Sequence, residues 1–368
     1  MKVVFFVHSL LSDWNHGNAH FLRGVVTELL ARGHAVDVWE PREAWSVTNL
    51  LADAGPSAID AFRRAYPQLA SHRYDGPTPS LERALDGADL VLVHEWNSAE
   101  LVAAVGRHRA ESGSFRLLFH DTHHRAVTAP EEMAAYDLRH YDGVLAFGES
   151  IREQYLRHGW AERIWTWHEA ADVRIFHPLP RDPEGDVVWI GNWGDEERSA
   201  ELRELLIEPV RALHLSADVH GVRYPEEAVR LLRASGIDYH GWLPNFLAPE
   251  AFARHRVTMH VPRRPYVEAL PGVPTIRVFE ALACGIPLLS APWHDSEHLF
   301  TPGRDFLVAH NGAEMQQRLR QVLHEPACAE ELRQHGLETI RARHTCAHRV
   351  DELLAIAASM SDALAAKA

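Results

Sequence analysis

The first 39 residues alternate between strand, loop, helix and strand, and this order restricts the fold more than any other feature. Val3 to Val7 is an apolar run typical of a buried parallel strand. A polar loop, Ser12 to Asn18, follows it. The pattern then predicts a helix from Ala19 to Arg32, Gly33 as its cap, and a second strand from Ala35 to Trp39. Two parallel strands joined by a helix begin a doubly wound sheet, so we expect an α/β protein.

Three further predicted strands each end in polar residues. These strands are Leu90 to Val93, Arg116 to Phe119 and Gly143 to Phe147. Ligands of doubly wound sheets bind at the carboxyl ends of the strands, so three such endings in succession predict a binding edge. By the same argument, the first loop belongs to this edge. We expect this edge to bind an acceptor substrate, meaning the molecule to which a group is transferred. The candidate acceptor-binding residues are His16, Gly17, Asn18, His94, Glu95 and Trp96.

The segment His120 to His124 is the best candidate for chemistry in the first half of the chain. His120, Asp121 or His123 could take a proton from an acceptor hydroxyl, and the sequence does not rank the three. A metal site is an alternative, but the sequence shows no second set of ligands at a metal-binding spacing. An ordinary loop is another, because the chain contains 26 histidines.

The second half repeats the alternation and adds arginines at strand ends. A strand from Asp186 to Ile190 leads into the glycine-bearing turn at Gly191 and Asn192, and a helix is predicted from Glu197 to Ile207. Further predicted elements are strands at Ala217 to His220 and Val257 to Val261 and a helix from Phe246 to His255. Arg198, Arg263 and Arg264 are candidate diphosphate ligands, since arginine binds phosphate through paired N–H groups.

A helix followed at once by a strand is predicted from Pro274 to Ser290. Thr275 lies where the helix begins, and Gly285 has the position after the helix that favours a left-handed residue. Arg277 and Glu280 stand three residues apart on one face. A helix start suits a diphosphate, and a carboxylate one turn later can accept from ribose hydroxyls. A solvated ion pair is the alternative interpretation.

The run from Arg277 to Ser290, RVFEALACGIPLLS, resembles the donor-site motif of GT-B glycosyltransferases. It is most similar to the CgeB-like branch of the large retaining family, also called glycosyltransferase family 4-like. The resemblance implies that Glu280 binds the nucleotide ribose. That family usually has a second glutamate eight residues earlier, which contacts the donor sugar, and Gly272 occupies that position here.

Other segments carry the same resemblance. Gly17 is similar to the family glycine after the first strand, and His120 to a histidine that contacts the donor sugar. Tyr239 to Leu243 resembles a strand whose Gly-x-Leu pattern, here Gly241, Trp242 and Leu243, places backbone groups against the nucleobase. The loop at Gly191 and Asn192 resembles the one that approaches the donor phosphates. Trp293 to Phe300, with Asp295 and Glu297, looks like the family's helix and loop after the motif.

The resemblance implies the GT-B fold, in which two Rossmann-like, doubly wound domains face a central cleft. We expect an acceptor domain at residues 1–178 and a donor domain at 186–343, with a proline-bearing linker at 178–185. Helices are predicted at 313–323 and 327–341. Residues 344–368 are expected to form a last helix, and the resemblance implies that it crosses back to the first domain, as in many GT-B proteins.

Composition excludes several kinds of chemistry. Lysine occurs only at Lys2 and Lys367, so no interior lysine can form a Schiff base or a P-loop. The net charge of −14 disfavours nucleic-acid partners. Three scattered cysteines and a short apolar start predict a cytoplasmic chain without a transmembrane segment.

The predicted function is transfer of a hexose-type sugar from a nucleotide-diphosphate sugar to an acceptor hydroxyl. No cofactor is expected. No Asp-x-Asp motif is present, so arginines and the helix start, rather than a metal ion, are expected to neutralise the leaving diphosphate. The acceptor could be a small molecule, a glycan or a protein hydroxyl, and the sequence does not predict an oligomeric state. The alternatives are a nucleotide-sugar epimerase or hydrolase, a metal-dependent hydrolase and a catalytically inactive sugar-binding protein.

Overall fold

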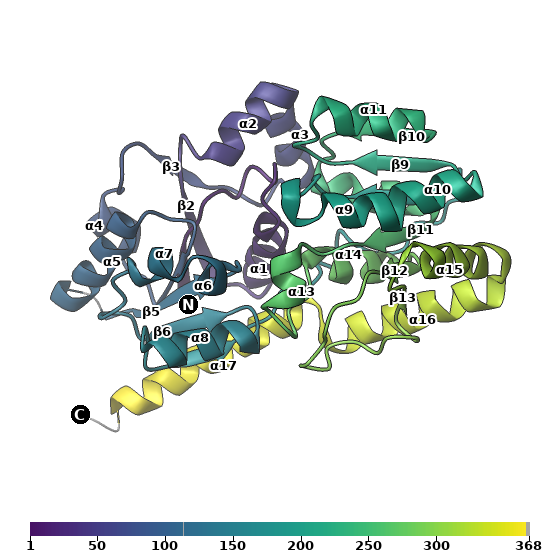
Figure 1. The fold of residues 1–368 in the computed structure, drawn as a ribbon. Coiled ribbons are helices and arrows are strands. Elements are labelled where there is room, and N and C mark those ends of the chain that lie inside the picture. The colour runs from purple at the N-terminus through teal and green to yellow at the C-terminus, as the bar shows by residue number, and fades with distance from the viewer. Residues whose placement is uncertain (113, 366–368) are drawn as a thin grey trace. The chain divides into compact units, whose positions relative to one another are not determined.

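The computed structural model describes residues 1–112 and 114–365, which form two compact units (Figure 1). The first unit combines Met1–Glu169 with the chain from Cys346 onward, and the second is Ala170–Thr345. Each unit is built on one parallel sheet. Among the described residues, no helix is both long enough and apolar enough to cross a lipid bilayer.

The sheet of the first unit has seven parallel strands in the order β3-β2-β1-β4-β5-β6-β7. The order reverses between β1 and β4, which pair in parallel from Val3 with Leu90 onward. Both central strands are almost entirely buried, because helices cover both faces of such a sheet. The strands are β1 (Lys2–Phe6), β2 (Ala35–Pro41), β3 (His72–Tyr74), β4 (Leu90–His94), β5 (Arg116–Asp121), β6 (Gly143–Ala146) and β7 (Ile164–Thr166).

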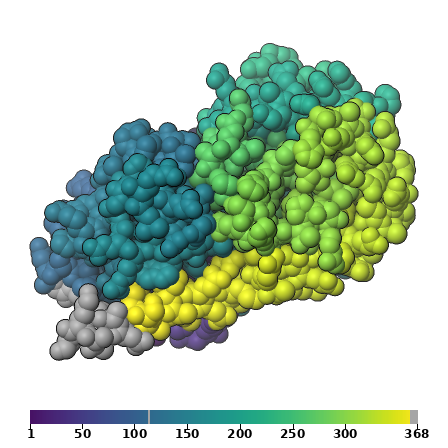
Figure 2. All heavy atoms as spheres, turned by 60° about the horizontal axis from the view of Figure 1, so that its bottom comes forward, coloured from purple at the N-terminus to yellow at the C-terminus, as the bar shows by residue number. Residues whose placement is uncertain are grey.

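The helices of the first unit include one from the far end of the sequence. The last helix packs on α1, and the indole Nε1 of Trp167 donates to the carbonyl of Arg349 at 2.8 Å. Figure 2 shows this helix, in yellow, along the surface of the unit. The helices are α1 (Asn18–Ala31), α2 (Trp45–Ala54), α3 (Ser57–Ala65), α4 (Leu81–Leu85), α5 (Ala99–Ser112), α6 (Arg125–Thr128), α7 (Pro130–Ala134), α8 (Glu149–His158) and α17 (Cys346–Ala365).

The sheet of the second unit has six strands in the order β10-β9-β8-β11-β12-β13, all in parallel pairs. One core, with Val187, Val219 and Met259 at its centre, packs the sheet against helices on one face. The strands are β8 (Gly185–Ile190), β9 (Ala217–His220), β10 (Ile237–Gly241), β11 (His255–His260), β12 (Leu288–Ser290) and β13 (Leu307–Val308).

The helical segments of the second unit range from single turns to 18 residues. They are η1 (Asp195–Glu197), α9 (Ser199–Leu202), the π-helical turn η2 (Arg203–Ile207), α10 (Glu208–Leu213), α11 (Glu226–Ala234), η3 (Asn245–Leu247), α12 (Ala248–Ala253), α13 (Arg264–Glu268), α14 (Ile276–Cys284), α15 (Gly312–His324) and α16 (Pro326–Arg343). The predicted doubly wound α/β architecture is confirmed in both units.

Three predicted helices are wrong in detail. The helix expected at 197–207 is interrupted at Arg198, which has φ −152°, so that η1 ends before it and α9 begins after it. The π-helical turn η2 then precedes α10, because Pro209 has no N–H to bond the carbonyl four residues earlier. The one expected at 246–255 ends at Ala253, and His255 already belongs to β11. Trp293 to Phe300 forms no helix; His298 has φ 54°, and Asp295 accepts from the N–H groups of Leu299 and Phe300.

Candidate functional site

The start of α14 is held by a buried histidine from β11. The Nε2 atom of His260 lies 3.1 Å from the hydroxyl of Thr275, the residue before the helix, and its Nδ1 lies 3.0 Å from the hydroxyl of Ser290 on β12. Ser290 donates to the carbonyl of Ala291, so it accepts from Nδ1–H. Nε2 is then the acceptor of the Thr275 hydroxyl. One imidazole thus fixes the helix start against two strand ends.

This imidazole is neutral at physiological pH. Burial, and secondarily the nearby Arg198, lower the pKa of His260 to about 3. Because the ring is neutral, His260 adds no positive charge at the start of α14. The first-turn N–H groups and the partial positive charge of the helix are therefore the electrostatic features that an anion meets there.

Glu280 is fully buried one turn into α14, at 0% exposure. Its carboxylate accepts from Arg277 Nη1 at 2.6 Å and from Asn245 Nδ2 at 3.0 Å. The same guanidinium lies 3.4 Å from the Asn245 side-chain oxygen. The structure thus brings the predicted pair Arg277 and Glu280 together and adds Asn245 to it.

Arg198 lies under the loop that follows β8. Its guanidinium stacks on Trp189 with 5.1 Å to the ring centroid and donates to the carbonyls of Val261 and Asn192 and to the Asn192 side chain. Burial, and then the charge of Arg263, lower its pKa to about 10, so it stays cationic at neutral pH. Arg198 is only 8% exposed, so it holds the loop in place and points little into solvent.

Gly194 is the residue that lets Arg198 come so close. It has φ +80°, and a Cβ added there would lie 2.8 Å from both Cβ and Nε of Arg198. A side chain at this position would therefore both strain the backbone and displace the guanidinium.

The ends of β8, β9 and β10 are joined by backbone contacts at three glycines. Gly191 N donates to the carbonyl of His220, and Gly221 N donates to the carbonyl of Gly241. A Cβ on Gly221 would lie 1.9 Å from the Gly191 oxygen. The predicted residues Gly191 and Gly241 are thus adjacent through Gly221, which the sequence interpretation missed. Trp242 and Leu243 continue from β10 and are half-buried.

Arg263 and Arg264 follow β11 but have acidic partners. Arg263 Nη1 lies 2.8 Å from a Glu197 carboxylate oxygen, and Arg264 Nε lies 3.3 Å from Glu201. Arg264 keeps 45% of its side chain exposed, against 22% for Arg263. A bound anion would therefore compete with Glu197 and Glu201 for these guanidiniums.

Gly272 occupies the position at which the family that this sequence resembles has a second glutamate, and the carboxylate of Glu297 lies beside it. Gly272 has φ +85°, and a Cβ added there would lie 2.7 Å from Cγ and 2.8 Å from Oε1 of Glu297. Gly272 N donates to the carbonyl of His294 in the same loop. The Glu297 side chain, from the loop after β12, thus occupies the space that a side chain at 272 would need.

In the first unit, two buried histidines face each other at the ends of β4 and β5. His94 Nε2 and His120 Nδ1 are 3.4 Å apart, in register across the two strands. Burial lowers the pKa of His94 to about 3 and that of His120 well below its usual value. Both rings are neutral, and His120 packs edge-on against Phe21 and Trp167.

Next to them, two buried carboxyl groups share a hydrogen bond. Burial, and then the charge of Asp121, raise the pKa of Glu95 well above its usual range, and burial raises that of Asp121. Asp121 also accepts from the Tyr155 hydroxyl at 2.9 Å and from the His123 N–H at 3.1 Å. Arg125 lies 3.3 Å from Glu95. Two carboxyl groups in contact favour one shared proton, which is consistent with the raised pKa of both.

Aromatic side chains cover the same edge of the first unit. Trp96 lies under the Arg125 guanidinium at 4.3 Å and against the ring of His123 at 4.9 Å. Trp45, from α2, packs on His8 and Trp96 and remains 36% exposed. Planar, partly exposed rings of this kind pack well against the C–H faces of sugars.

The first loop of this edge is rigidly braced. Leu10 N and Leu11 N donate to the buried carboxylate of Glu40, and Arg23 forms a buried ion pair with Asp13 at 2.8 Å. His16 is buried against His8, and burial keeps its pKa well below the usual value. Gly17 is exposed just before α1, and Asn18, the first residue of α1, is buried.

Sequence reasoning missed five residues at these two edges: Trp45, Gly221, Asn245, His260 and, as a site residue, Glu297. His260 ends a predicted strand, so its position at a carboxyl end was available as a signal. Asn245 and Trp45 lie outside any predicted strand end. His120 and Asp121 have no exposed surface, whereas His123 is partly exposed.

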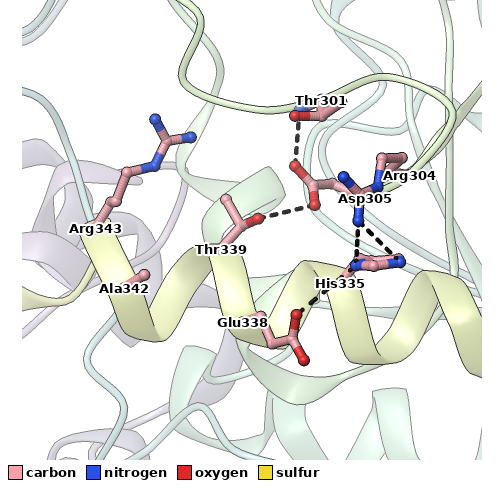
Figure 3. A pocket seen from close by; sticks show the side chains of 8 residues that line it. All are labelled: Thr301, Arg304, Asp305, His335, Glu338, Thr339, Ala342 and Arg343. Carbon is pink, nitrogen blue, oxygen red and sulfur yellow. Dashed lines mark hydrogen bonds and ion pairs between the residues drawn. The ribbon is translucent and has the colours of Figure 1, made fainter.

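A separate polar pocket of about 270 Å³ lies between α16 and the loop at 301–305 (Figure 3). Asp305 accepts from Thr301 N at 2.7 Å and from the Thr339 hydroxyl at 2.9 Å, and Arg304 lies 3.3 Å from His335. None of the predicted site residues lines this pocket.

The chain is similar to known proteins in sequence over part of its length and in fold over nearly all of it. Residues 198–355 match the model of the glycosyl transferase-like family. No curated protein matches the chain. The fold is similar to sucrose-phosphate synthase from Thermosynechococcus elongatus, with a TM-score of 0.65, 15% identity and coverage of 99% of this chain and 100% of that one.

Two other solved structures are similar over nearly their whole length. HepE from Anabaena, in complex with UDP and glucose, has a TM-score of 0.68 and 13% identity, with 98% of this chain and 100% of that one covered. An alpha-glucosyltransferase in complex with UDP-glucose and DNA has a TM-score of 0.70 and 10% identity, with 97% and 99% covered. Residues 198–355 therefore match a glycosyl transferase-like domain, and the chain as a whole has the GT-B fold of the solved glycosyltransferase structures.

Proposed function

We propose that the chain is a glycosyltransferase that moves a hexose-type sugar from a UDP-sugar to an acceptor hydroxyl without a metal ion on the diphosphate. The observation that carries the proposal is the buried carboxylate of Glu280, one turn behind the start of α14. This arrangement suits a nucleotide, with phosphate at the helix start and ribose hydroxyls on the carboxylate. The HepE structure contains UDP and glucose, and the alpha-glucosyltransferase structure contains UDP-glucose.

The remaining donor contacts are assigned by position. Gly191, Asn192 and Arg198 at the end of β8, together with Arg263, Arg264 and Thr275, would neutralise the diphosphate. Arg198 remains cationic, which supports this role. Arg277 and Glu280 would hold the ribose, and Gly241, Trp242 and Leu243 the base. Glu297 offers the carboxylate next to Gly272, where the related family uses a glutamate side chain for the sugar.

The acceptor is assigned to the first unit. His16, Gly17, Asn18, His94, Glu95 and Trp96 would form its binding edge, with Trp45 added from the structure. Among the catalytic candidates His120, Asp121 and His123, we assign the contact with the acceptor hydroxyl to His123, because it alone has exposed surface. Asp121 would position it through the His123 N–H.

The finer assignments are also proposals. We place the chain in the cytoplasm and in the CgeB-like branch of its family, and we retain the boundaries 1–178, 186–343 and 344–368 for its three parts. A nucleic-acid acceptor, as bound by the alpha-glucosyltransferase, is disfavoured by the net charge of −14.

The test is a thermal-shift panel of nucleotide sugars followed by an incubation of the best binder with and without hydroxyl acceptors, each with EDTA present. A ligand that binds the native state raises the melting temperature. We expect a UDP-sugar to give the largest shift and transfer to require an acceptor. Conversion of the donor alone would favour an epimerase or hydrolase, and binding without any product would favour an inactive sugar-binding protein. Loss of transfer in EDTA, with the melting temperature and UDP binding unchanged, would refute metal independence.

A further inference from the structure

Three potential metal ligands lie together on the edge strand β10 and its neighbour β9 in the second unit. Asp218 and His220 are two residues apart on β9 and therefore share one face of the sheet, and His240 lies on the neighbouring parallel strand β10. Each offers one ligand atom, and the three atoms lie within 4.8 Å of one another. None of these residues belongs to the proposed donor site.

The side chains of this group contact one another. His240 Nε2 lies 3.0 Å from Asp218 Oδ1. The rings of His220 and His240 are stacked, with 4.8 Å between centroids and 23° between planes. His220 is only 7% exposed, and the nearby Asp218 and His240 act on its imidazole electrostatically. An imidazole held beside a carboxylate and a second imidazole makes a suitable set of donors for a metal ion.

A fourth side chain stands behind the carboxylate. His255 Nε2 lies 3.2 Å from Asp218 Oδ2, and its Nδ1 lies 2.8 Å from the carbonyl of Ala251. A carbonyl only accepts, so Nδ1 carries the proton, and the ring faces Asp218 through Nε2. A backbone carbonyl commonly fixes a metal-binding histidine in this way.

The backbone around His255 makes room for this arrangement. A Cβ on Gly185 would lie 2.8 Å from Cδ2 and 2.9 Å from Nε2 of the His255 ring. Glycine at 185 therefore allows the imidazole to lie across β8 toward β9. Because Asp218 is 33% exposed and His240 45% exposed in their side chains, an ion could reach the group from solvent.

We propose that Asp218, His220 and His240 bind a divalent transition metal ion of the zinc class, with His255 as a fourth ligand or as the partner that orients Asp218. Two or three imidazoles and one carboxylate match the donors that Zn²⁺ prefers, whereas Ca²⁺ and Mg²⁺ prefer all-oxygen sites. Tetrahedral zinc with bonds of about 2.0–2.1 Å separates its ligand atoms by about 3.3 Å, so binding requires only a small closure of the group.

A bound ion would join β9 to the edge strand β10. It would stabilise the second unit, because a ligand that binds only the folded state raises its stability. This role is separate from sugar transfer, which we propose to proceed without a metal on the diphosphate.

The test uses the full-length chain after removal of metal by a chelator and dialysis, with no nucleotide present. Zn²⁺ alone is titrated by calorimetry, and Co²⁺ is added as a spectroscopic substitute. We expect one ion per chain, a rise in melting temperature and a Co²⁺ absorption band typical of four or five ligands. His220→Ala and His240→Ala should each weaken Zn²⁺ binding by at least roughly 100-fold, and His255→Ala by about 10- to 100-fold.

His310→Ala is the matched control. His310 pairs with Glu314 at 2.9 Å, the same kind of imidazole–carboxylate contact, but on the surface and outside this group. Its variant should bind Zn²⁺ like the unmodified chain. The absence of binding heat in the unmodified chain would refute the site. So would binding of equal affinity and stoichiometry in a His220→Ala, His240→Ala double variant, since other histidines would then hold the ion. UDP binding to the metal-free chain is measured separately, so failure of either proposal is recognised independently.

Discussion

Arg277 and Glu280, three residues apart on α14, form an ion pair with 2.6 Å between guanidinium and carboxylate, and Asn245 donates to the same carboxylate at 3.0 Å. Glu280→Gln should weaken UDP binding by roughly 10- to 100-fold, because hydrogen bonds to a charged acceptor contribute about 1.5–3 kcal/mol. Calorimetry with UDP measures the effect. The control is Glu330→Gln, since Glu330 forms an exposed pair of the same spacing with Arg333. Equal UDP affinity in both variants would contradict the ribose assignment.

Gly194→Ala should destabilise the chain and weaken UDP binding. The new Cβ would meet Arg198 at 2.8 Å, in addition to the cost of about 1–2 kcal/mol for a left-handed alanine. Gly33→Ala separates the two effects, because Gly33 also has φ +80° but nothing within 4 Å of its added Cβ. Urea unfolding should show a larger loss for Gly194→Ala, and only that variant should lose UDP affinity. Identical behaviour of the two variants would show that Arg198 tolerates displacement.

His260 should make stability depend on pH. Its pKa is about 3 in the folded chain and about 6.5 in an unfolded chain, so between these values the unfolded state binds one more proton. The stability that it contributes is complete above pH 6.5 and is lost as the pH falls, by about 1.4 kcal/mol per pH unit. His260→Gln should therefore show a shallower decline of the free energy of unfolding between pH 6 and 5. Urea titrations at both pH values measure it, and an unchanged decline would contradict a neutral His260.

The predictions of the fold succeeded where the information was local. Gly285 ends α14 in the left-handed conformation with φ 65°, as its position after the apolar run predicted. The parallel arrangement follows from the alternation of strands and helices, because a strand–helix–strand connection joins parallel strands. The π-helical turn before α10 was missed, since the effect of Pro209 reaches back several residues through its missing N–H.

The site was harder to predict than the fold, because its contacts join distant residues. Asn245 and Glu280 are 35 positions apart, and His260 reaches Thr275 and Ser290, 15 and 30 positions away. Arg263 and Arg264 could be placed at a strand end, but their pairing with Glu197 and Glu201 depends on how α9 and α13 pack. Residue type and periodicity do not predict such contacts between side chains that are distant in the sequence.

His123→Ala should lower the turnover number by about 100-fold or more, the usual contribution of a general base, and leave UDP affinity unchanged. A transfer assay at saturating donor and acceptor measures it. His158→Ala is the control, because His158 also contacts a tryptophan, Trp160, although its ring is stacked whereas that of His123 is edge-on to Trp96. Full turnover in His123→Ala would shift the assignment to His120 or Asp121.

Trp45→Ala should raise the KM for the acceptor by about 2- to 10-fold, the loss expected for one aromatic contact, with little change in stability. The control is Leu51→Ala on the same helix α2, since Leu51 is 40% exposed and Trp45 36%. Steady-state kinetics with varied acceptor distinguish the two variants. An equal KM in both would exclude Trp45 from the acceptor edge.

The first unit is discontinuous along the chain, because α17 packs on α1 and Trp167 donates to Arg349. During synthesis by the ribosome, the second unit is therefore translated completely before the last helix of the first unit emerges. Until α17 has been synthesised, part of the apolar surface of α1 remains uncovered. A stop codon near residue 345 would damage the half of the protein that was translated first.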